Sequence, residues 1–310
     1  MNNSVKITFL DNFDKPIRAH GGCILFYQGF YYWYGEDREG DTYVRCYKSE
    51  NLTSWIDCGP IITSGTPTKN MFSYMTGGLT NCKGGRVNLE RPKVIYNRQS
   101  GMFIMYVHYE NGIDYLEAAI GVAFSFFPDK NFIYLGHYRP FGHMSRDCTL
   151  FVDDDQSAFF ISASNDNLDL MIYKLSNDYL EIDSRVNTLF KGLSREAPTL
   201  IKDDGIYYLF TSGCTGWFPN QCMFSFSSSI KGEWSELIKI GDNNTFHSQP
   251  AFMIRLNGSV YYVGDVWGGY KWDSIKDFDY EKSTYIILPI ELSKKETAFK
   301  LTKTKMTRKI

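Results

Sequence analysis

One unit of sequence recurs five times along the chain, and this repetition restricts the possible folds more than any other feature. Each copy begins with a polar residue and a short gap, continues as an apolar strand, turns tightly, and returns as an aromatic strand. Two of the turns are Asp204-Gly205 and Asn257-Gly258, dipeptides that favour the tight turn of a β-hairpin. The leading polar residues of the five copies stand 70, 57, 49 and 53 positions apart. They are His20, Glu90, Asp147, Glu196 and Gln249.

In two of the copies the hairpin is succeeded by two more strand-like segments. Residues 47–49 lead to a Trp-containing strand at 54–56, and residues 224–227 lead to another at 232–235. Each unit therefore has four strands, and four-stranded units that recur at roughly 40–50 residues or somewhat more are typical of a β-propeller. A β-sandwich gives no reason for a polar residue at one fixed place in each unit. We predict an all-β chain, a five-bladed β-propeller with four-stranded antiparallel blades, formed as a single domain by residues 1–310.

Composition agrees with a strand-rich globular chain and excludes several classes of partner. Aromatic residues make up 16% of the sequence, which favours strands over helices. The formal net charge of −2 gives no electrostatic basis for nucleic acid or an anionic membrane as the main partner. No apolar run approaches the roughly 20 residues of a membrane span, and the first residues lack the apolar core of a secretory signal. The seven cysteines show no CxxC pair and no metal-type spacing, so we expect reduced thiols in a cytoplasmic protein.

The five leading residues hold a common position in a propeller. The first strand of each blade lines the central axis, so a residue just before that strand projects into the mouth on one face. Five distant parts of the chain then meet in one pocket. Water along the axis explains a single polar residue at this position. Three carboxylates close together repel one another and cost folding free energy, which indicates that they have a function. Paired carboxylates without a nucleophile–base pair indicate glycoside hydrolysis, in which a second negative charge raises the pKa of the acid from ~4.3 towards ~6–7.

Motifs in all five units carry a more specific resemblance. Arg195-Glu196-Ala197-Pro198 resembles the general-acid motif of family 43 glycoside hydrolases, and Ser145-Arg146-Asp147 resembles their third-blade motif. Further segments are similar to the exo-β-1,3-galactanase and galactosidase branch of this family, so that the match extends over roughly residues 17–270. These segments are Ala19-His20-Gly21-Gly22, Tyr31-Tyr32-Trp33-Tyr34-Gly35-Glu36, Glu90-Arg91-Pro92-Lys93-Val94, Ser212-Gly213-Cys214-Thr215-Gly216-Trp217 with Pro219-Asn220, and Ser248-Gln249.

The resemblance implies a role for each of the predicted catalytic residues. Glu196 is the implied general acid, and Asp147 is the implied modulator of its pKa. Most of the family places an Asp base in the first blade, where this chain has His20-Gly21-Gly22. The branch with this loss is thought to hold the hydrolytic water with a glutamine and a glutamate, here Gln249 and Glu90, and to invert the anomeric carbon. An amide in its ordinary form is no useful base, so Glu90 is the better proton acceptor if it reaches the water, and which of the two takes the proton stays open.

A further set of polar residues stands where the second strand of each unit ends. Such groups can bind the hydroxyls of galactose, and two tryptophans that follow the fourth and fifth hairpins can stack on the apolar face of a sugar. Most aromatic residues of this chain, by contrast, are expected simply to pack the sheets. The predicted substrate-binding residues are His20, Glu36, His108, Asn165, Thr215, Trp217, Asp265 and Trp267.

These observations lead to a specific expectation about function. We expect an inverting, exo-acting glycoside hydrolase that releases terminal β-1,3-linked galactose from galactan or arabinogalactan-type oligosaccharides. One alternative keeps the fold and the acid chemistry but acts on arabinofuranose or xylose. The other, which the missing first-blade base favours, is a carbohydrate-binding propeller without catalysis. The expected partner is an oligosaccharide or polysaccharide; no cofactor and no metal site are predicted, while a structural ion such as calcium on the axis and the oligomeric state stay open.

Overall fold

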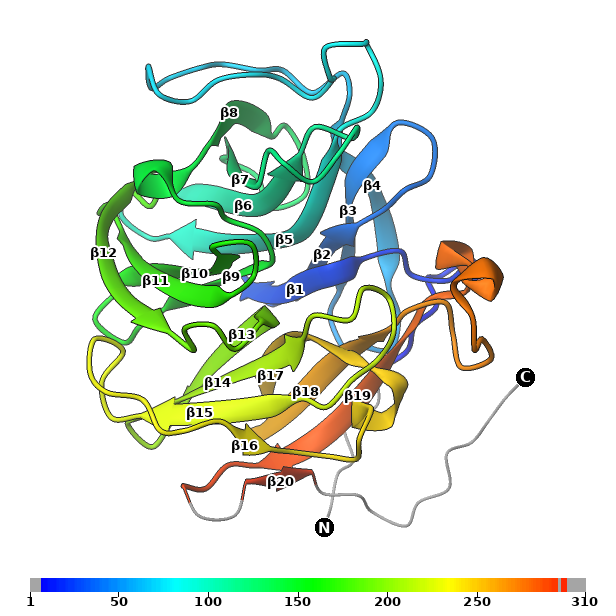
Figure 1. The fold of residues 1–310 in the computed structure, drawn as a ribbon. Helices are drawn as coiled ribbons and strands as arrows, with labels where there is room; N and C mark the ends of the chain where they lie inside the picture. The colour runs from blue at the N-terminus through cyan, green and yellow to red at the C-terminus, as the bar shows by residue number, and fades with distance from the viewer. Residues whose placement is uncertain (1–6, 295–296, 300–310) are drawn as a thin grey trace.

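The computed structural model describes residues 7–294 and 297–299, and strands dominate it (Figure 1). The strands form five four-stranded sheets, and in each sheet they lie side by side in chain order and antiparallel. The innermost strands β1, β5, β9, β13 and β17 contact one another in turn, and β17 contacts β1, so the ring of sheets is closed. The predicted five-bladed β-propeller is therefore confirmed. The predicted single domain of residues 1–310 includes stretches at both ends that lie outside the described residues.

The blades follow one another along the chain without exchanging strands. The first two blades consist of β1 (His20–Tyr27), β2 (Phe30–Glu36), β3 (Thr42–Ser49) and β4 (Ile56–Thr63), and of β5 (Asn88–Asn97), β6 (Met102–Glu110), β7 (Ala119–Ser125) and β8 (Ile133–Tyr138). The third and fourth consist of β9 (Cys148–Val152), β10 (Ala158–Ser164), β11 (Asp169–Leu175) and β12 (Ile182–Leu189), and of β13 (Arg195–Asp203), β14 (Ile206–Gly213), β15 (Met223–Ser227) and β16 (Ile238–Lys239). The fifth consists of β17 (Gln249–Leu256), β18 (Ser259–Val266), β19 (Thr284–Glu291) and β20 (Ala298–Phe299).

Helical structure is confined to short turns within the described part of the chain. No helix there is both long and apolar enough to cross a membrane. The helical elements of residues 7–294 and 297–299 are four 3-10 turns, η1 (Pro140–Gly142), η2 (Thr245–His247), η3 (Ile275–Asp277) and η4 (Tyr280–Lys282).

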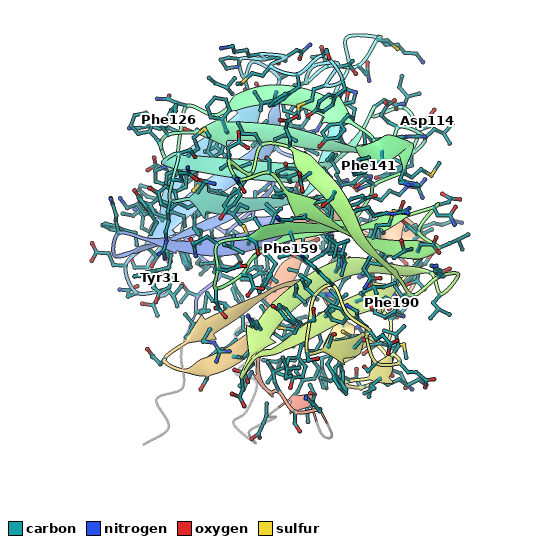
Figure 2. All side chains as sticks on the ribbon, turned by 90° about the vertical axis from the view of Figure 1, so that its left-hand side faces the viewer. Tyr31, Asp114, Phe126, Phe141, Phe159 and Phe190 are labelled. Atoms are coloured by element: carbon teal, nitrogen blue, oxygen red, sulfur yellow. The ribbon has the colours of Figure 1, made fainter. Side chains whose placement is uncertain are left out.

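Five of the six hydrophobic core clusters of the described residues lie between two neighbouring blades, and the small sixth lies within the fifth blade. On β10, Phe159 packs with the fourth blade, whereas its neighbour Phe160 packs with the second blade. Successive side chains of a strand point to opposite faces of the sheet, so a strand between two other sheets needs apolar residues at consecutive positions. This explains the aromatic runs in the second strand of each unit. Figure 2 shows Phe159 inside the molecule, while Phe126 and Phe141 lie at its surface.

A bulge interrupts the pairing of the innermost strand near the leading residue in four of the five blades. The register shifts between His20 and Cys23, between Glu90 and Lys93, between Glu196 and Thr199, and between Pro250 and Phe252. The residue that follows the leading residue has a positive φ in three of these blades, at Gly21, Arg91 and Ala197. A bulge bends the strand and re-aims a side chain. The bulges thus turn the leading side chains towards one mouth of the axis.

The outer strand of the fourth blade differs from the prediction. Residues 232–235 form no strand, and β16 lies farther along the chain at Ile238–Lys239. Here the hydroxyl of Ser235 accepts a hydrogen bond from the backbone N–H of Phe226 at 3.1 Å and lies 3.2 Å from the hydroxyl of Ser225. Serine side chains that bond nearby backbone groups replace ladder hydrogen bonds. The predicted strand at 232–235 was therefore wrong.

Candidate active site

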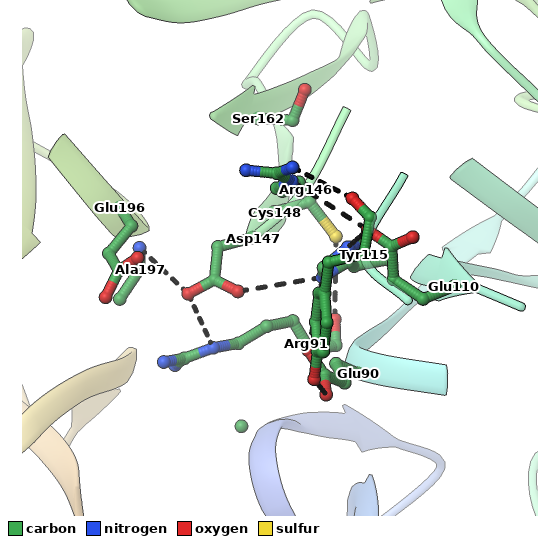
Figure 3. Close-up of polar contacts among 12 residues, drawn as sticks. Glu90, Arg91, Glu110, Tyr115, Arg146, Asp147, Cys148, Ser162, Glu196 and Ala197 are labelled. Carbon is green, nitrogen blue, oxygen red and sulfur yellow. Dashed lines mark hydrogen bonds and ion pairs between the residues drawn. The ribbon is translucent and has the colours of Figure 1, made fainter. Parts of the chain in front are cut away.

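Glu196 and Asp147 lie side by side at the start of two adjacent blades. Glu196 begins the bulge of β13, and Asp147 directly precedes β9. The backbone N–H of Ala197 donates to Oδ2 of Asp147 at 3.1 Å, and the same oxygen lies 3.1 Å from Nε of Arg91 (Figure 3). Asp147 is thereby held as an acceptor next to Glu196 by two donors from different blades.

The surroundings of Glu196 favour its protonated form. Burial and the negative charge of Asp147 raise the pKa of Glu196 to about 7, against the opposing charge of Arg91. Desolvation and a like charge both disfavour an ionised carboxyl group. A carboxyl group that keeps its proton near neutral pH is suited to act as a general acid.

Gln249 uses both ends of its amide within the site. Its Nε2 donates to Oε1 of Glu196 at 3.1 Å and to the hydroxyl of Ser212 at 3.0 Å. Its Oε1 accepts hydrogen bonds from Nη2 of Arg91 and, at 2.8 Å, from Nε1 of Trp267. These four bonds fix the orientation of the amide, because the oxygen faces only donors and the nitrogen faces acceptors.

Glu90 is ionised in a cluster of donors. Its Oε1 accepts from the hydroxyl of Tyr115 at 2.7 Å and from Nη2 of Arg38 at 3.2 Å, and its Oε2 lies 3.3 Å from Nδ1 of His108. Burial alone raises the pKa of this carboxyl group, but the hydrogen bond and charge of His108 and the charge of Arg38 outweigh burial and lower it to about 2. Glu90 therefore carries a negative charge at every pH of interest.

His108 is buried behind Glu90 and bridges two carboxylates. Its Nε2 lies 2.9 Å from Oε1 of Glu110, a fully buried carboxylate that also accepts from the backbone N–H of Ala118. Burial lowers the pKa of His108, but hydrogen bonds with Glu110 and Glu90 raise it to about 9. The ring is consequently an imidazolium at neutral pH, and both of its nitrogens face protein carboxylates.

This imidazolium and two nearby carboxylates lie close enough together to be compared with a metal site. Ligand atoms of Glu90, His108 and Asp147 lie within 4.8 Å of one another, the one such group of His, Cys, Asp and Glu among the described residues. A metal requires a neutral imidazole. In this structure both nitrogens of His108 face carboxylates, Nδ1 at 3.3 Å from Oε2 of Glu90 and Nε2 at 2.9 Å from Oε1 of Glu110, so the three side chains form an ion-paired cluster.

His20 stands where most of the resembled family has its base, and it is held in a buried pair. Its Nδ1 lies 3.1 Å from Oδ1 of Asp265, whose other oxygen accepts from the backbone N–H of Gly21 at 3.0 Å. Its ring stacks on Tyr285 with 4.7 Å between centroids and 17° between planes. The ring of Trp267 also lies against His20, with 5.3 Å between centroids, so His20 is held in a buried pair with Asp265 between aromatic rings.

An aromatic wall borders the site. Trp217 and Trp267 meet edge to face with centroids 5.1 Å apart, and Trp267 stacks on Tyr280 at 5.8 Å. The guanidinium of Arg38 lies over the rings of both Trp217 and Tyr280. Glu36 accepts from Arg38 at 3.2 Å and from the hydroxyl of Tyr280 at 3.0 Å. Of the two predicted stacking residues, Trp217 is partly exposed, whereas Trp267 is buried and holds Gln249.

Two predicted substrate-binding residues form their hydrogen bonds within their own loops. Asn165 is exposed and donates to Asp169 at 3.2 Å. Thr215 donates to the carbonyl of Phe218 at 2.6 Å. A neighbour of the first, Asn167, reaches the site instead, because its Nδ2 lies 3.3 Å from Oε2 of Glu196.

Several residues of this site were not predicted from the sequence. Arg91 follows Glu90 directly, and its positive φ at the bulge was the feature that the sequence did not reveal. Glu110 stands two positions after His108 on β6, so the period of a strand was a usable signal that both point to one face. The missed residues whose side chains form hydrogen bonds with predicted ones include Arg38, Arg91, Glu110, Tyr115, Asn167, Ser212 and Tyr280.

Comparisons with known proteins agree with this geometry. The sequence model of glycosyl hydrolases family 43 matches residues 17–224. An exo-β-1,3-galactanase from Clostridium thermocellum is 38% identical, with a TM-score of 0.84, over 94% of this chain and 64% of that chain. An exo-β-1,3-galactanase from Phanerochaete chrysosporium, solved with β-1,3-galactotriose, is 29% identical, with a TM-score of 0.78, over 94% of this chain and 64% of that chain.

A third similar structure has nearly the same length as this chain. It is a GH43 β-1,3-galactosidase solved with galactodeoxynojirimycin, 30% identical with a TM-score of 0.79, and the alignment covers 95% of this chain and 96% of that chain. The chain thus spans less than two thirds of the two galactanases and almost all of this galactosidase. No curated protein matches the chain.

Proposed function

The chain belongs to glycosyl hydrolases family 43, and from this membership we propose that it is an exo-acting hydrolase of terminal β-1,3-linked galactose. Its substrate is a carbohydrate, namely a galactan or arabinogalactan-type oligosaccharide. The similar galactanases and galactosidase support the choice of sugar. The observation that carries the proposal is the partly buried Glu196 beside Asp147, with its pKa raised to about 7.

In the proposed reaction Glu196 protonates the glycosidic oxygen as the bond to the leaving sugar breaks. Asp147 does not touch the proton; its charge keeps Glu196 protonated before the reaction. A water molecule attacks the anomeric carbon from the opposite face, and the configuration inverts. No cofactor is required, because every proton in this scheme moves between the substrate, water and side chains of this chain.

We assign Glu90 as the acceptor of the proton that the attacking water loses, and Gln249 as the residue that positions the other groups of the site. The amide of Gln249 already bonds Glu196, Ser212, Trp267 and Arg91, and both of its N–H groups face acceptors. Glu90 is ionised and can accept a proton. The cations that stabilise its charge make it a weak base, so its role depends on proximity to the water more than on basicity.

Hydrolysis of defined oligosaccharides tests the proposal. We expect release of galactose from β-1,3-galactobiose and β-1,3-galactotriose, with proton NMR showing the α-anomer first. Aryl β-galactoside, α-arabinofuranoside and β-xyloside are the comparison substrates. Faster turnover of the arabinofuranoside or xyloside would be consistent with the proposed acid catalysis but would contradict the proposed specificity for galactose. Binding of galactobiose without turnover of any substrate would show a carbohydrate-binding propeller.

A further inference from the structure

A second ring of side chains surrounds the axis, two or three positions after the leading residues in the sequence. It borders a cavity of about 910 Å³ that extends towards the hairpin turns and is lined by all five innermost strands. None of the leading residues lines this cavity. The ring, which we call the lower ring, consists of Cys23, Lys93, Thr149, Thr199 and Phe252.

Lys93 is the charged member of the lower ring, and it is almost fully buried. Its Nζ donates to the carbonyl oxygen of Gly21, which is one bond for a group with three N–H donors. Gly21 has a φ of 58°, a conformation that turns its carbonyl towards Lys93 while its N–H bonds Asp265. Among the described residues Lys93 forms no ion pair with any carboxylate.

The nearby acids are already bound to other groups. Asp265 contacts His20 and Gly21, and Asp147 contacts Arg91 and the backbone of Ala197. Burial and the positive charge of Arg91 lower the pKa of Lys93 to about 8. A buried charge normally has a partner of opposite sign. An anion next to this ammonium group would offset both the free-energy cost of its burial and its repulsion from Arg91.

The rest of the lower ring adds hydroxyl donors and no free acid. The hydroxyls of Thr149 and Thr199, both buried residues on the cavity lining, have no hydrogen-bond partner among the described residues. The carboxylates on the lining, those of Asp153 and Asp154, lie farther along the chain towards the turn and bind Nζ of Lys202 at 2.6 and 2.8 Å. The lower ring thus presents an unpaired cation and two hydroxyls to the cavity.

We propose that the lower ring is a binding site for a small monovalent anion such as chloride, held by the ammonium group of Lys93 and the hydroxyls of Thr149 and Thr199. The site is separate from the candidate active site and does not depend on the reaction assigned to it. The bound anion supplies the negative charge that Lys93 lacks, at the centre of the propeller where the innermost strands of the five blades meet.

Chloride-35 NMR tests the site without any measurement of activity. We expect the folded protein to broaden the chloride line in a saturable way, and bromide to reverse the broadening. Lys93→Met should lose this effect, whereas the exposed Lys191→Met, the matched loss of one lysine charge, should keep it. Equal broadening by wild type and Lys93→Met, or none by wild type, would overturn the proposal.

Two further measurements keep the proposal testable if Lys93→Met does not fold. Thr149→Val combined with Thr199→Val retains the ammonium group and should weaken the saturable broadening; unchanged broadening would exclude the hydroxyls as ligands. Crystals of the wild-type protein soaked in bromide should show an anomalous peak within hydrogen-bond distance of Nζ of Lys93. A bromide-soaked crystal without that peak would contradict the site.

Discussion

The side-chain amide of Gln249 donates from Nε2 to Oε1 of Glu196 over 3.1 Å, although the two residues lie 53 positions apart in the chain. The bond joins the first strands of the fourth and fifth blades at the mouth of the axis. It fixes one oxygen of the proposed acid and brings the fifth-blade glutamine next to it. The response of the site to mutation and to pH depends on this contact and on the charges around it.

The first prediction concerns the general acid. We expect Glu196→Gln to lower kcat on β-1,3-galactobiose by about 10²–10⁴-fold, because general acid catalysis contributes on that order. The carboxamide keeps the shape of the side chain and an oxygen for Gln249, so the melting temperature should change little. Initial rates and thermal melting check both statements. Glu233→Gln, at an exposed position, is the control, and turnover retained by Glu196→Gln would remove Glu196 from this role.

The second prediction concerns the pH dependence of the wild-type enzyme and of Asp147→Asn. Glu196 must be protonated, so kcat/KM should fall as the pH rises through about 7, where burial and the charge of Asp147 place its pKa. Removal of that charge in Asp147→Asn lowers the pKa of Glu196 and should move the alkaline limb to lower pH. An alkaline limb at the same pH in both proteins would contradict the tuning role.

The third prediction concerns Gln249→Glu, which should shift the alkaline limb of kcat/KM in the direction opposite to that expected for Asp147→Asn. Gln249→Glu keeps the shape of the side chain but places a carboxylate against Oε1 of Glu196, where an N–H donor stood. A like charge raises the pKa of a carboxyl group, so the alkaline limb of kcat/KM should move to higher pH. Rate profiles measured beside those of Asp147→Asn check the direction, and a shift towards lower pH would rule out the proposed contact.

The fourth prediction links His108 to stability. Its pKa is about 9 in the folded protein against the ordinary 6.5, so its stabilising effect is complete below pH 6.5 and is lost as the pH rises through 9. The shift corresponds to a free energy on the order of 3 kcal/mol. The free energy of unfolding in urea should therefore fall more between pH 6 and 9.5 in wild type than in His108→Gln. Identical pH dependence in the two proteins would show that the imidazolium does not stabilise the fold.

The fifth prediction concerns metal removal. Dialysis against EDTA should leave kcat unchanged, because His108 and Arg38 already pair with Glu90, and Arg91 already pairs with Asp147. Calcium or zinc added afterwards should not raise the rate. Activity that disappears with EDTA and returns with a divalent ion would instead show that this cluster holds a metal.

Features close together in the chain were predicted well. The five blades followed from hairpin turns and from the repeated leading residues, because turn dipeptides and strand alternation are local properties. The strand predicted at 232–235 failed, since the hydroxyl of Ser235 bonds the neighbouring strand in place of a regular ladder. The partners within the site were harder to find, and Asn167 contacts Glu196 where Asn165 had been predicted to bind substrate.

The amino-acid sequence by itself determined that five polar residues share one mouth of a propeller, because each is placed by the repeat that contains it. Only the tertiary structure decided their charges and orientations. Arg91 holds Gln249 and Asp147, Glu110 keeps His108 protonated, and burial beside Asp147 raises the pKa of Glu196. Burial and the distances between charges on different blades set these properties, and neither quantity can be read from the order of residues along the chain.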